Sequence, residues 1–109
     1  MNKSNKYRNQ KITFEGITFD SKKEAKRYQD LKLLEEANII QNLVRQVHFE
    51  LVPKQNGERA VKYIADFMYV ETATGKIIVE DVKGYRTDVY KLKRKLFKWR
   101  YPQYTFLET

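Results

Sequence analysis

The chain has 109 residues, a length that suits one domain with a single hydrophobic core. Hydrophobic residues make up 41% of it, which excludes the composition of a disordered protein even though 33% of the residues are charged. There is no cysteine, which excludes disulfides and thiolate zinc sites, and no apolar run is long enough to span a membrane. We therefore expect a soluble cytoplasmic protein without a membrane partner.

The formal net charge of +8 is concentrated in two segments. Residues 1–11 carry four Lys or Arg and no acid, and residues 84–102 carry seven against one Asp. Basic segments of this kind suit binding to a polyanion such as DNA, although they also serve solubility alone. We interpret residues 1–10 as a flexible basic arm and residues 11–109 as one folded domain.

A small hairpin and a helix are predicted next along the chain. Residues 12–14 and 17–19 flank a Glu-Gly turn, which is the pattern of a β-hairpin that packs over the core. Ser21 then begins a helix that we expect to run to about Ala37, where Asn38 provides a left-handed stop.

Glu24 in this helix is an acidic residue at an inward-facing position. Projection at about 100° per residue places it near the middle of the apolar stripe of the helix. That stripe contains Ala25, Tyr28, Leu31 and Leu34. Two explanations compete: Glu24 can complete a capping box with Ser21, or it can serve a buried functional site.

Three strands are predicted between this helix and residue 84. Residues 40–53 alternate apolar and polar side chains, and residues 61–70 and 76–83 flank a Thr-Ala-Thr-Gly turn that favours an antiparallel hairpin. His48, the only histidine, alternates away from the apolar side chains of its strand. We interpret it as an exposed strand residue rather than a general base.

Both strands of the hairpin carry acids where a buried strand should have none. Asp66 interrupts the apolar run of the first strand, and Glu80 and Asp81 interrupt that of the second. Because strand side chains alternate, Asp81 and Lys83 share one face while Glu80 and Val82 take the other. Asp66, Asp81 and Lys83 can therefore converge.

Two acids from adjacent strands and a following lysine suit a hydrolase that holds a divalent cation against a phosphodiester. Mg²⁺ prefers hard oxygen ligands, polarises the phosphoryl oxygen and lowers the pKa of bound water. The lysine can position that water or stabilise the charge that develops. The same residue types on a strand also occur as ordinary edge or salt-bridge residues.

A second helix is predicted from Thr87 to about Tyr101, where Pro102 stops it, and residues 103–108 alternate as a last strand. The apolar stripe of this helix is expected to contain Val89, Leu92, Leu96 and Trp99. The basic side chains of the helix are either a solvated face or a DNA-binding surface. The candidate DNA-binding residues are Lys91, Lys93, Arg94, Lys95 and Lys98.

The acidic pattern resembles that of the PD-(D/E)XK nuclease superfamily. Asp66 takes the first acidic position and Asp81-Val82-Lys83 the (D/E)XK positions, while Ala65 stands where the family has proline. The order of elements resembles the αβββαβ core of the restriction-endonuclease-like α/β fold, a mixed sheet flanked by helices, here with a small N-terminal β-hairpin. The segments FDSKKEAKRYQDL, VEDVKG and YKLKRKLF are similar to small phage proteins of this superfamily, among them Holliday-junction resolvases.

This resemblance implies a metal-dependent DNA endonuclease that uses Mg²⁺, with Mn²⁺ as a substitute, to hydrolyse phosphodiester bonds in branched DNA. It also implies a homodimer in the cytoplasm of a bacterial host. The catalytic residues would be Glu24, Asp66, Asp81 and Lys83. The metal ligands would be Asp66, Asp81, Val82 and Glu24. Gln46, at the start of a strand, would face the site and contact DNA.

The alternative is a non-catalytic DNA-binding or assembly module on the same fold. Both interpretations predict a basic surface. Only the nuclease predicts a carboxylate cluster that binds metal.

Overall fold

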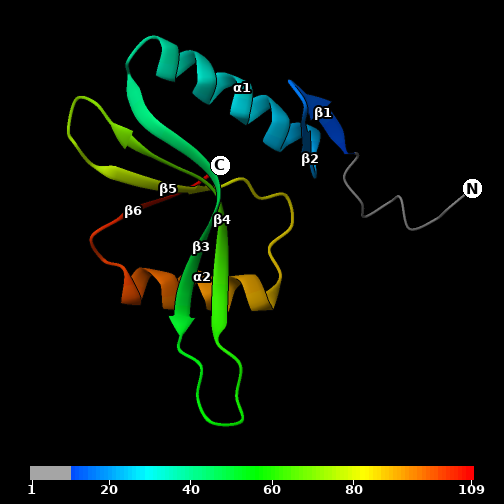
Figure 1. Cartoon of the computed structure of the whole chain (residues 1–109), viewed down its shortest axis with the longest axis vertical. Helices are drawn as coiled ribbons and strands as arrows, with labels where there is room; N and C mark the ends of the chain where they lie inside the picture. The colour runs from blue at the N-terminus through cyan, green and yellow to red at the C-terminus, as the bar shows by residue number, and fades with distance from the viewer. Residues whose placement is uncertain (1–10) are drawn as a thin grey trace, which may run out of the picture.

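The computed structural model describes residues 11–109, which form two helices and six strands (Figure 1). The predicted basic arm, residues 1–10, lies outside the described residues. In chain order the elements are β1 (Ile12–Phe14), β2 (Ile17–Phe19), α1 (Lys22–Glu36), β3 (Ile40–Val52), β4 (Val61–Glu71), β5 (Ile77–Asp81), α2 (Asp88–Arg100) and β6 (Thr105–Glu108). Every predicted helix and strand is present, in the predicted order. No helix within the described range is long and apolar enough to cross a membrane.

The strands form a two-stranded hairpin, β1-β2, and a four-stranded mixed sheet in the order β3-β4-β5-β6. β3, β4 and β5 are antiparallel neighbours, whereas β6 runs parallel to β5. A parallel pair cannot be joined by a tight turn, and α2 provides the crossover between β5 and β6. The fold class is therefore α/β, as predicted.

The two helices cover opposite faces of the sheet, and each forms its own hydrophobic core. Adjacent residues of β5 show this division, because Ile78 belongs to the core of α1 and Val79 to the core of α2. The α1 core contains Phe19, Ala25, Tyr28, Leu31, Ile40, Phe67, Tyr69 and Ile78. The α2 core contains Phe49, Leu51, Tyr63, Ala65, Val79, Tyr90 and Phe97. β5 is thus buried on both sides, which explains its continuous apolar run.

Local interactions determine where α1 begins and ends. The Ser21 hydroxyl accepts a hydrogen bond from the backbone N–H of Glu24 at 3.1 Å, and Asn38 takes a left-handed φ of 61° just after the helix. Both ends agree with the prediction. The β1-β2 hairpin packs on this helix through Phe19, whose ring centroid lies 5.2 Å from that of Tyr28.

The predicted apolar stripe of α2 is wrong for three of its four residues, and Leu96 alone of the four packs against the core. Val89 and Trp99 are 64% and 75% exposed, and Leu92 is exposed as well. The buried residues of α2 are Tyr90 and Phe97 instead. Phe97 packs against the rings of Phe49, Tyr63 and Phe106, and this aromatic cluster determines which side of the helix faces the sheet. Apolar side chains of α2 are therefore left on the surface.

Candidate active site

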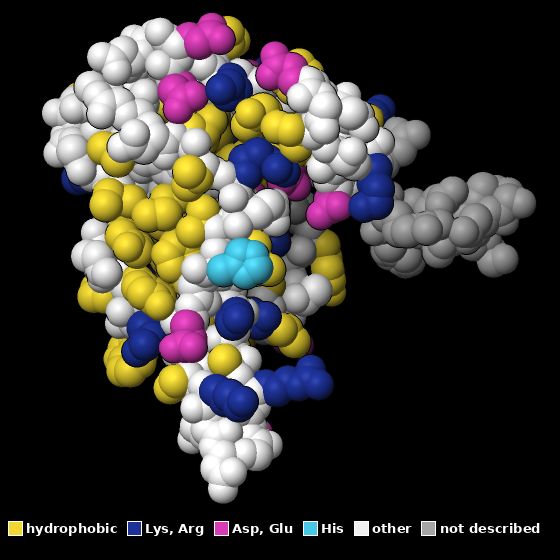
Figure 2. Space-filling model, in the orientation of Figure 1, with side chains coloured by type: hydrophobic (Ala, Val, Ile, Leu, Met, Phe, Trp, Pro, Cys, Tyr) yellow, Lys and Arg dark blue, Asp and Glu magenta, His cyan; other side chains and the backbone are white. Residues whose placement is uncertain are grey.

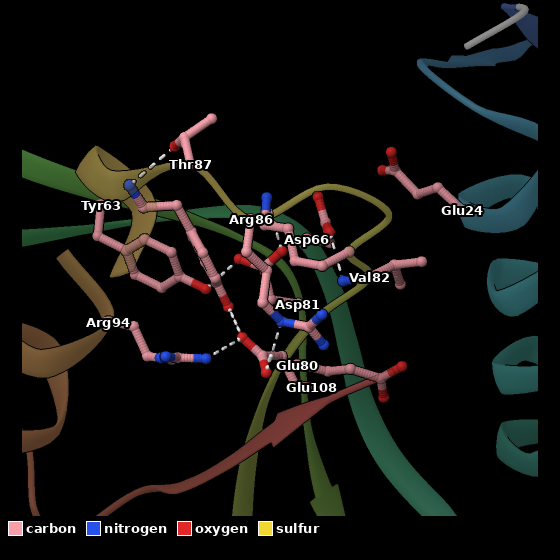
Figure 3. A network of polar contacts seen from close by, with 12 residues as sticks. Glu24, Tyr63, Asp66, Glu80, Asp81, Val82, Arg86, Thr87, Arg94 and Glu108 are labelled. Carbon is pink, nitrogen blue, oxygen red and sulfur yellow. Dashed lines mark hydrogen bonds and ion pairs between the residues drawn. The ribbon is translucent and has the colours of Figure 1, made fainter. Parts of the chain in front are cut away.

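The two aspartates singled out in the sequence lie on the central strands β4 and β5 (Figure 3). Asp81 is the last residue of β5, and only 1% of it is exposed. Asp66 in β4 accepts a hydrogen bond from the backbone N–H of Val82 at 2.7 Å, which ties its carboxylate to the end of β5. The two acids therefore meet where β5 ends.

Asp81 has one oxygen in a hydrogen bond and the other without one. Tyr63, which the sequence marked only as a strand residue, donates its hydroxyl hydrogen to Oδ2. Oδ1 lies 3.0 Å from Nζ of Lys83, yet within the described part of the chain this buried oxygen accepts no hydrogen bond. Lys83 Nζ also lies 4.5 Å from the ring centroid of Tyr90. The lysine therefore holds Oδ1 in an ion pair without a well-aligned hydrogen bond.

Glu80, the neighbour of Asp81 in sequence, has its carboxylate fully occupied. It is completely buried. Arg27 donates to Oε2 at 2.5 Å and to Oε1 at 3.1 Å. The Tyr69 hydroxyl donates to Oε1 at 2.6 Å, and the Thr109 hydroxyl donates to Oε2 at 3.0 Å. A buried acid with both oxygens satisfied belongs to the structural framework, in contrast to Asp81.

Glu24 faces inward from α1, as the projection predicted, and it is buried. Its carboxylate accepts a hydrogen bond from Nε2 of Gln46 at 3.3 Å and lies 3.8 Å from Nη2 of Arg45. The bond to the Ser21 cap is made by the backbone N–H of Glu24, so the carboxylate is left to contact β3. Figure 3 shows Glu24 apart from the aspartate pair, with its carboxylate pointing in the direction of Asp66.

Gln46 has a backbone conformation that is unusual in a strand. Its φ is 53°, in the left-handed region that costs a residue with a Cβ about 1 kcal/mol or more. The neighbouring pairs of the β3-β4 register place it opposite Asp66. Strain of this kind persists where the surrounding contacts determine it, and here it accompanies the hydrogen bond to Glu24.

Burial makes the charged forms of the acids at this site unfavourable. Burial, followed by the carboxylate of Asp81, raises the pKa of Asp66 to about 7, although the N–H of Val82 opposes the shift. Burial also raises the pKa of Glu24. Burial and the charge of Asp81 raise the pKa of Tyr63 far above its usual value, so its hydroxyl stays a hydrogen-bond donor at neutral pH. A cation beside Asp66 and Asp81 would relieve their mutual repulsion.

The residues present fit a divalent cation held by two carboxylates rather than by a closed protein cage. Among residues 11–109, no three His, Cys, Asp or Glu side chains come close enough together to hold a metal ion. Mg²⁺ usually keeps several waters and binds through one or two carboxylates plus substrate phosphates. Oδ1 of Asp81, which is held by the Lys83 ion pair and not by a hydrogen bond, and the raised pKa of Asp66 suit such a site. A direct bond from Glu24 to the metal stays a prediction.

The family model described as "Protein of unknown function (DUF1064)" matches residues 4–107, nearly the whole chain. The chain belongs to the DUF1064 family. No curated protein matches it, and no solved structure matches it either. Because the family description names no activity, the function of this DUF1064 protein has to be argued from its site.

The basic side chains of α2 that were predicted to bind DNA differ in their exposure and in their contacts within this DUF1064 protein. The exposed group on α2 contains Lys91, Lys95 and Lys98. Lys93 is half-buried and lines a groove together with Lys83. Arg94 donates to Glu108 at 2.8 Å. The lysines are therefore available to phosphates, whereas Arg94 is engaged within the protein.

The cluster around Glu108 was not found from the sequence. This glutamate in β6 accepts hydrogen bonds from Tyr90, from Arg86 at 3.1 Å and from Arg94 at 2.8 Å. Burial alone would raise the pKa of Glu108, but these bonds outweigh burial and lower the pKa to about 2. The parallel register of β5 and β6 pairs Glu108 with Asp81, and no local sequence pattern reveals that pairing.

Proposed function

We propose that this DUF1064 protein is a metal-dependent endodeoxyribonuclease. The observation that carries the proposal is the contrast between two adjacent buried acids: four hydrogen bonds hold both oxygens of Glu80, whereas Oδ1 of Asp81 accepts no hydrogen bond within residues 11–109 and is held by an ion pair with Lys83 at 3.0 Å. A carboxylate oxygen held by one flexible lysine can take a cation as a further partner, whereas a carboxylate enclosed by four hydrogen bonds has no position left for one. With Asp66 and Lys83 beside it, that partner is a cation that faces an anionic substrate.

The metal ligands in this proposal are Asp66, Asp81 and the Val82 carbonyl. When bound, Mg²⁺ or Mn²⁺ polarises a phosphoryl oxygen and lowers the pKa of a bound water. Tyr63 fixes the Asp81 carboxylate through Oδ2 and leaves Oδ1 as a ligand. The backbone N–H of Val82 orients the Asp66 carboxylate in the same way.

Lys83 and Glu24 act on the substrate and the water in this mechanism. The ammonium group of Lys83, held between Asp81 and the Tyr90 ring, stabilises negative charge that develops on the phosphate. Glu24, whose pKa is raised by burial, accepts a hydrogen bond from the attacking water. Gln46 keeps the Glu24 carboxylate in its orientation. No residue of this set has to form a covalent bond with the substrate.

Branched DNA is the proposed substrate, a homodimer the proposed assembly and the bacterial cytoplasm the proposed location. All three follow from the resemblance to phage Holliday-junction resolvases. The exposed apolar side chains of Leu92 and Trp99 on α2 support the homodimer, because such side chains favour a self-complementary contact. Two copies would bring one site to each of two strands.

A non-catalytic DNA-binding or assembly module is the second candidate. Two observations favour it: the acids within residues 11–109 form no group of three that could hold a metal, and Lys83 is already paired with Asp81. A binding module needs the basic surface but no cation. It predicts DNA binding that survives Asp81→Asn, with no cutting of any DNA.

Cutting that depends on an added cation tests the nuclease proposal. The protein is stripped of metal with a chelator, and Mg²⁺ or Mn²⁺ is then titrated with branched, nicked or linear DNA. We expect Asp66→Asn and Asp81→Asn to abolish cutting. The control is Asp30→Asn, which removes a partly exposed ion pair with Lys26 on α1 and should cut like the wild type. If both site variants still cut, the site assignment is wrong. If no protein cuts although all bind DNA, the binding module is correct.

A further inference from the structure

A groove with a volume of about 590 Å³ runs along residues 60–64, at the start of β4, and reaches Lys83. β4 pairs with β5 over Phe67–Val70, and the same register puts Asp66 beside Asp81 at the end of β5, so residues 61–65 of β4 extend beyond that end. The groove lies between this stretch and the first turns of α2, with Ile64 on one side and Thr87 on the other. It therefore continues directly from the candidate active site.

The charged side chains that line this groove are basic. Lys62, Lys83 and Lys93 line it together with His48, and none of its lining residues in the described chain is acidic. Figure 2 shows Lys and Arg side chains (dark blue) gathered below the histidine (cyan) on one face of the molecule. Three cations in a groove that ends at the site form a path for a chain of phosphates.

Apolar side chains lie among these lysines. Ile64 and Val89 line the groove and are 47% and 64% exposed. In a double helix the base faces stack on one another, so apolar side chains beside its backbone would contact no base face. An unpaired nucleotide offers a phosphate and a base face together, and base faces pack well on apolar surfaces. The volume of about 590 Å³ suits roughly one or two nucleotides.

We propose that this groove binds unpaired nucleotides of a DNA strand next to the phosphate that is cut. The inference rests on the proposed nuclease function and narrows its substrate to DNA with a single-stranded segment beside the cut. Lys62 and Lys93 contact the phosphates, and Ile64 and Val89 pack against a base. Lys83 joins the groove to the active site, because it lines the groove and lies 3.0 Å from Asp81.

DNA binding in a chelator, where no cutting occurs, tests the groove separately from the chemistry. The probe is a duplex with a single-stranded tail whose first unpaired base is 2-aminopurine, compared with the same duplex without a tail. We expect the tailed DNA to bind about tenfold more tightly and its 2-aminopurine fluorescence to change on binding. Ile64→Ser and Val89→Ser should each reduce this preference to about threefold or less. Leu33→Ser, on α1 and as exposed as Val89 at 64%, should keep the full preference.

The outcomes of this experiment test the groove proposal independently of the nuclease proposal. Equal affinity for tailed and untailed DNA, or an unchanged preference in both groove variants, overturns the groove proposal even if metal-dependent cutting is found. The opposite outcome is also possible: the protein prefers tailed DNA, Val89→Ser abolishes this preference, and no DNA is cut at any Mg²⁺ concentration. That outcome supports the groove proposal and contradicts the nuclease proposal. Thermal melting shows whether each variant is folded, and both groove substitutions replace side chains that are partly exposed.

Discussion

Glu80 and Asp81 are adjacent in β5 and both are buried, yet their side chains leave the strand on opposite faces. Glu80 lies on the α1 side, where Arg27 pairs with it through two hydrogen bonds. Asp81 lies on the α2 side, where Tyr63 satisfies only one of its oxygens. Alternation along a single strand thus separates a structural acid from a candidate functional one.

This contrast predicts different costs for removing the two acids. Glu80→Ala leaves the partly buried guanidinium of Arg27 without its partner, so it should lower the free energy of unfolding by about 3 kcal/mol. Asp81→Asn removes the ion pair with Lys83, but it keeps an acceptor for Tyr63 and removes repulsion with Asp66, so it should lower the free energy of unfolding by only about 1 kcal/mol. Urea unfolding in a chelator measures both. Equal costs would show that Asp81 is as structural as Glu80.

The pKa of Asp66 makes the stability of the metal-free protein depend on pH. The folded-state pKa of about 7 lies above the ordinary value of 3.8, so between these pH values the folded state binds a proton that the unfolded state has released. Stability should therefore fall as the pH rises through this window, by about 4 kcal/mol over its whole width. Urea unfolding in a chelator at several pH values checks the sign. Asp66→Asn should flatten the dependence, and an unchanged dependence in that variant would assign it to another group.

At the scale of elements, β3 and α2 are where local preference and the final structure disagree. β3 contains two left-handed residues, Asn42 at a φ of 59° beside a shift of the β3-β4 register and Gln46 at a φ of 53° beside Glu24. In α2 the helix turns two aromatic side chains inward and leaves three apolar ones exposed. Both departures lie next to the candidate site, one beside Glu24 and one along the groove.

The strain at Gln46 can be measured with two substitutions that both remove the bond to Glu24. Glycine adopts a positive φ without steric cost, whereas alanine does not. Gln46→Gly should therefore be more stable than Gln46→Ala by about 1 kcal/mol, contrary to the usual order for a strand position. Urea unfolding of the two variants side by side tests this. The reverse order would mean that residue 46 has an ordinary extended backbone in solution.

At the scale of the whole molecule, the distribution of charge links the groove to DNA binding. Basic residues on β4, after β5 and on α2 come together in the groove although they lie far apart in sequence. Of the acids of the site, by contrast, Asp81 and Glu24 are buried and Asp66 is partly buried. A polyanion can therefore approach without meeting the full charge of the carboxylates.

The salt dependence of DNA binding tests this arrangement. Lys93→Ala should weaken binding and reduce the slope of log K against log salt by about one unit for each phosphate that the variant no longer neutralises. Lys26→Ala removes the same charge from α1, far along the chain from the groove residues, and should leave the slope unchanged. Equal slopes for Lys93→Ala and the wild type would place the DNA path elsewhere.

The proposed homodimer predicts a further whole-molecule effect. Trp99 is 75% exposed on α2, so a charged residue there should not disturb the core but should disrupt an apolar contact between two copies. Light scattering after gel filtration should give the mass of a dimer for the wild type and of a monomer for Trp99→Glu. A wild-type monomer at high concentration would contradict the homodimer.

Local chemistry, readable from the sequence, determined the elements and part of the site. Capping by Ser21 and the left-handed Asn38 define α1, and alternation in β5 places Asp81 beside Lys83 and away from Glu80. These features depend on residues a few positions apart, so the sequence contains all the information they need.

Tertiary structure alone decided the rotation of α2, the parallel pairing that brings Glu108 beside Asp81, and the strained backbone of Gln46. Each of these results from contacts between segments distant in sequence. The orientation of α2 depends on which side chains fill the core beneath it, and the hydrogen bonding of Asp81 depends on which donors the rest of the fold brings within reach. Packing and hydrogen bonding across the whole domain select these arrangements, because burial and the pairing of buried polar groups outweigh local preference.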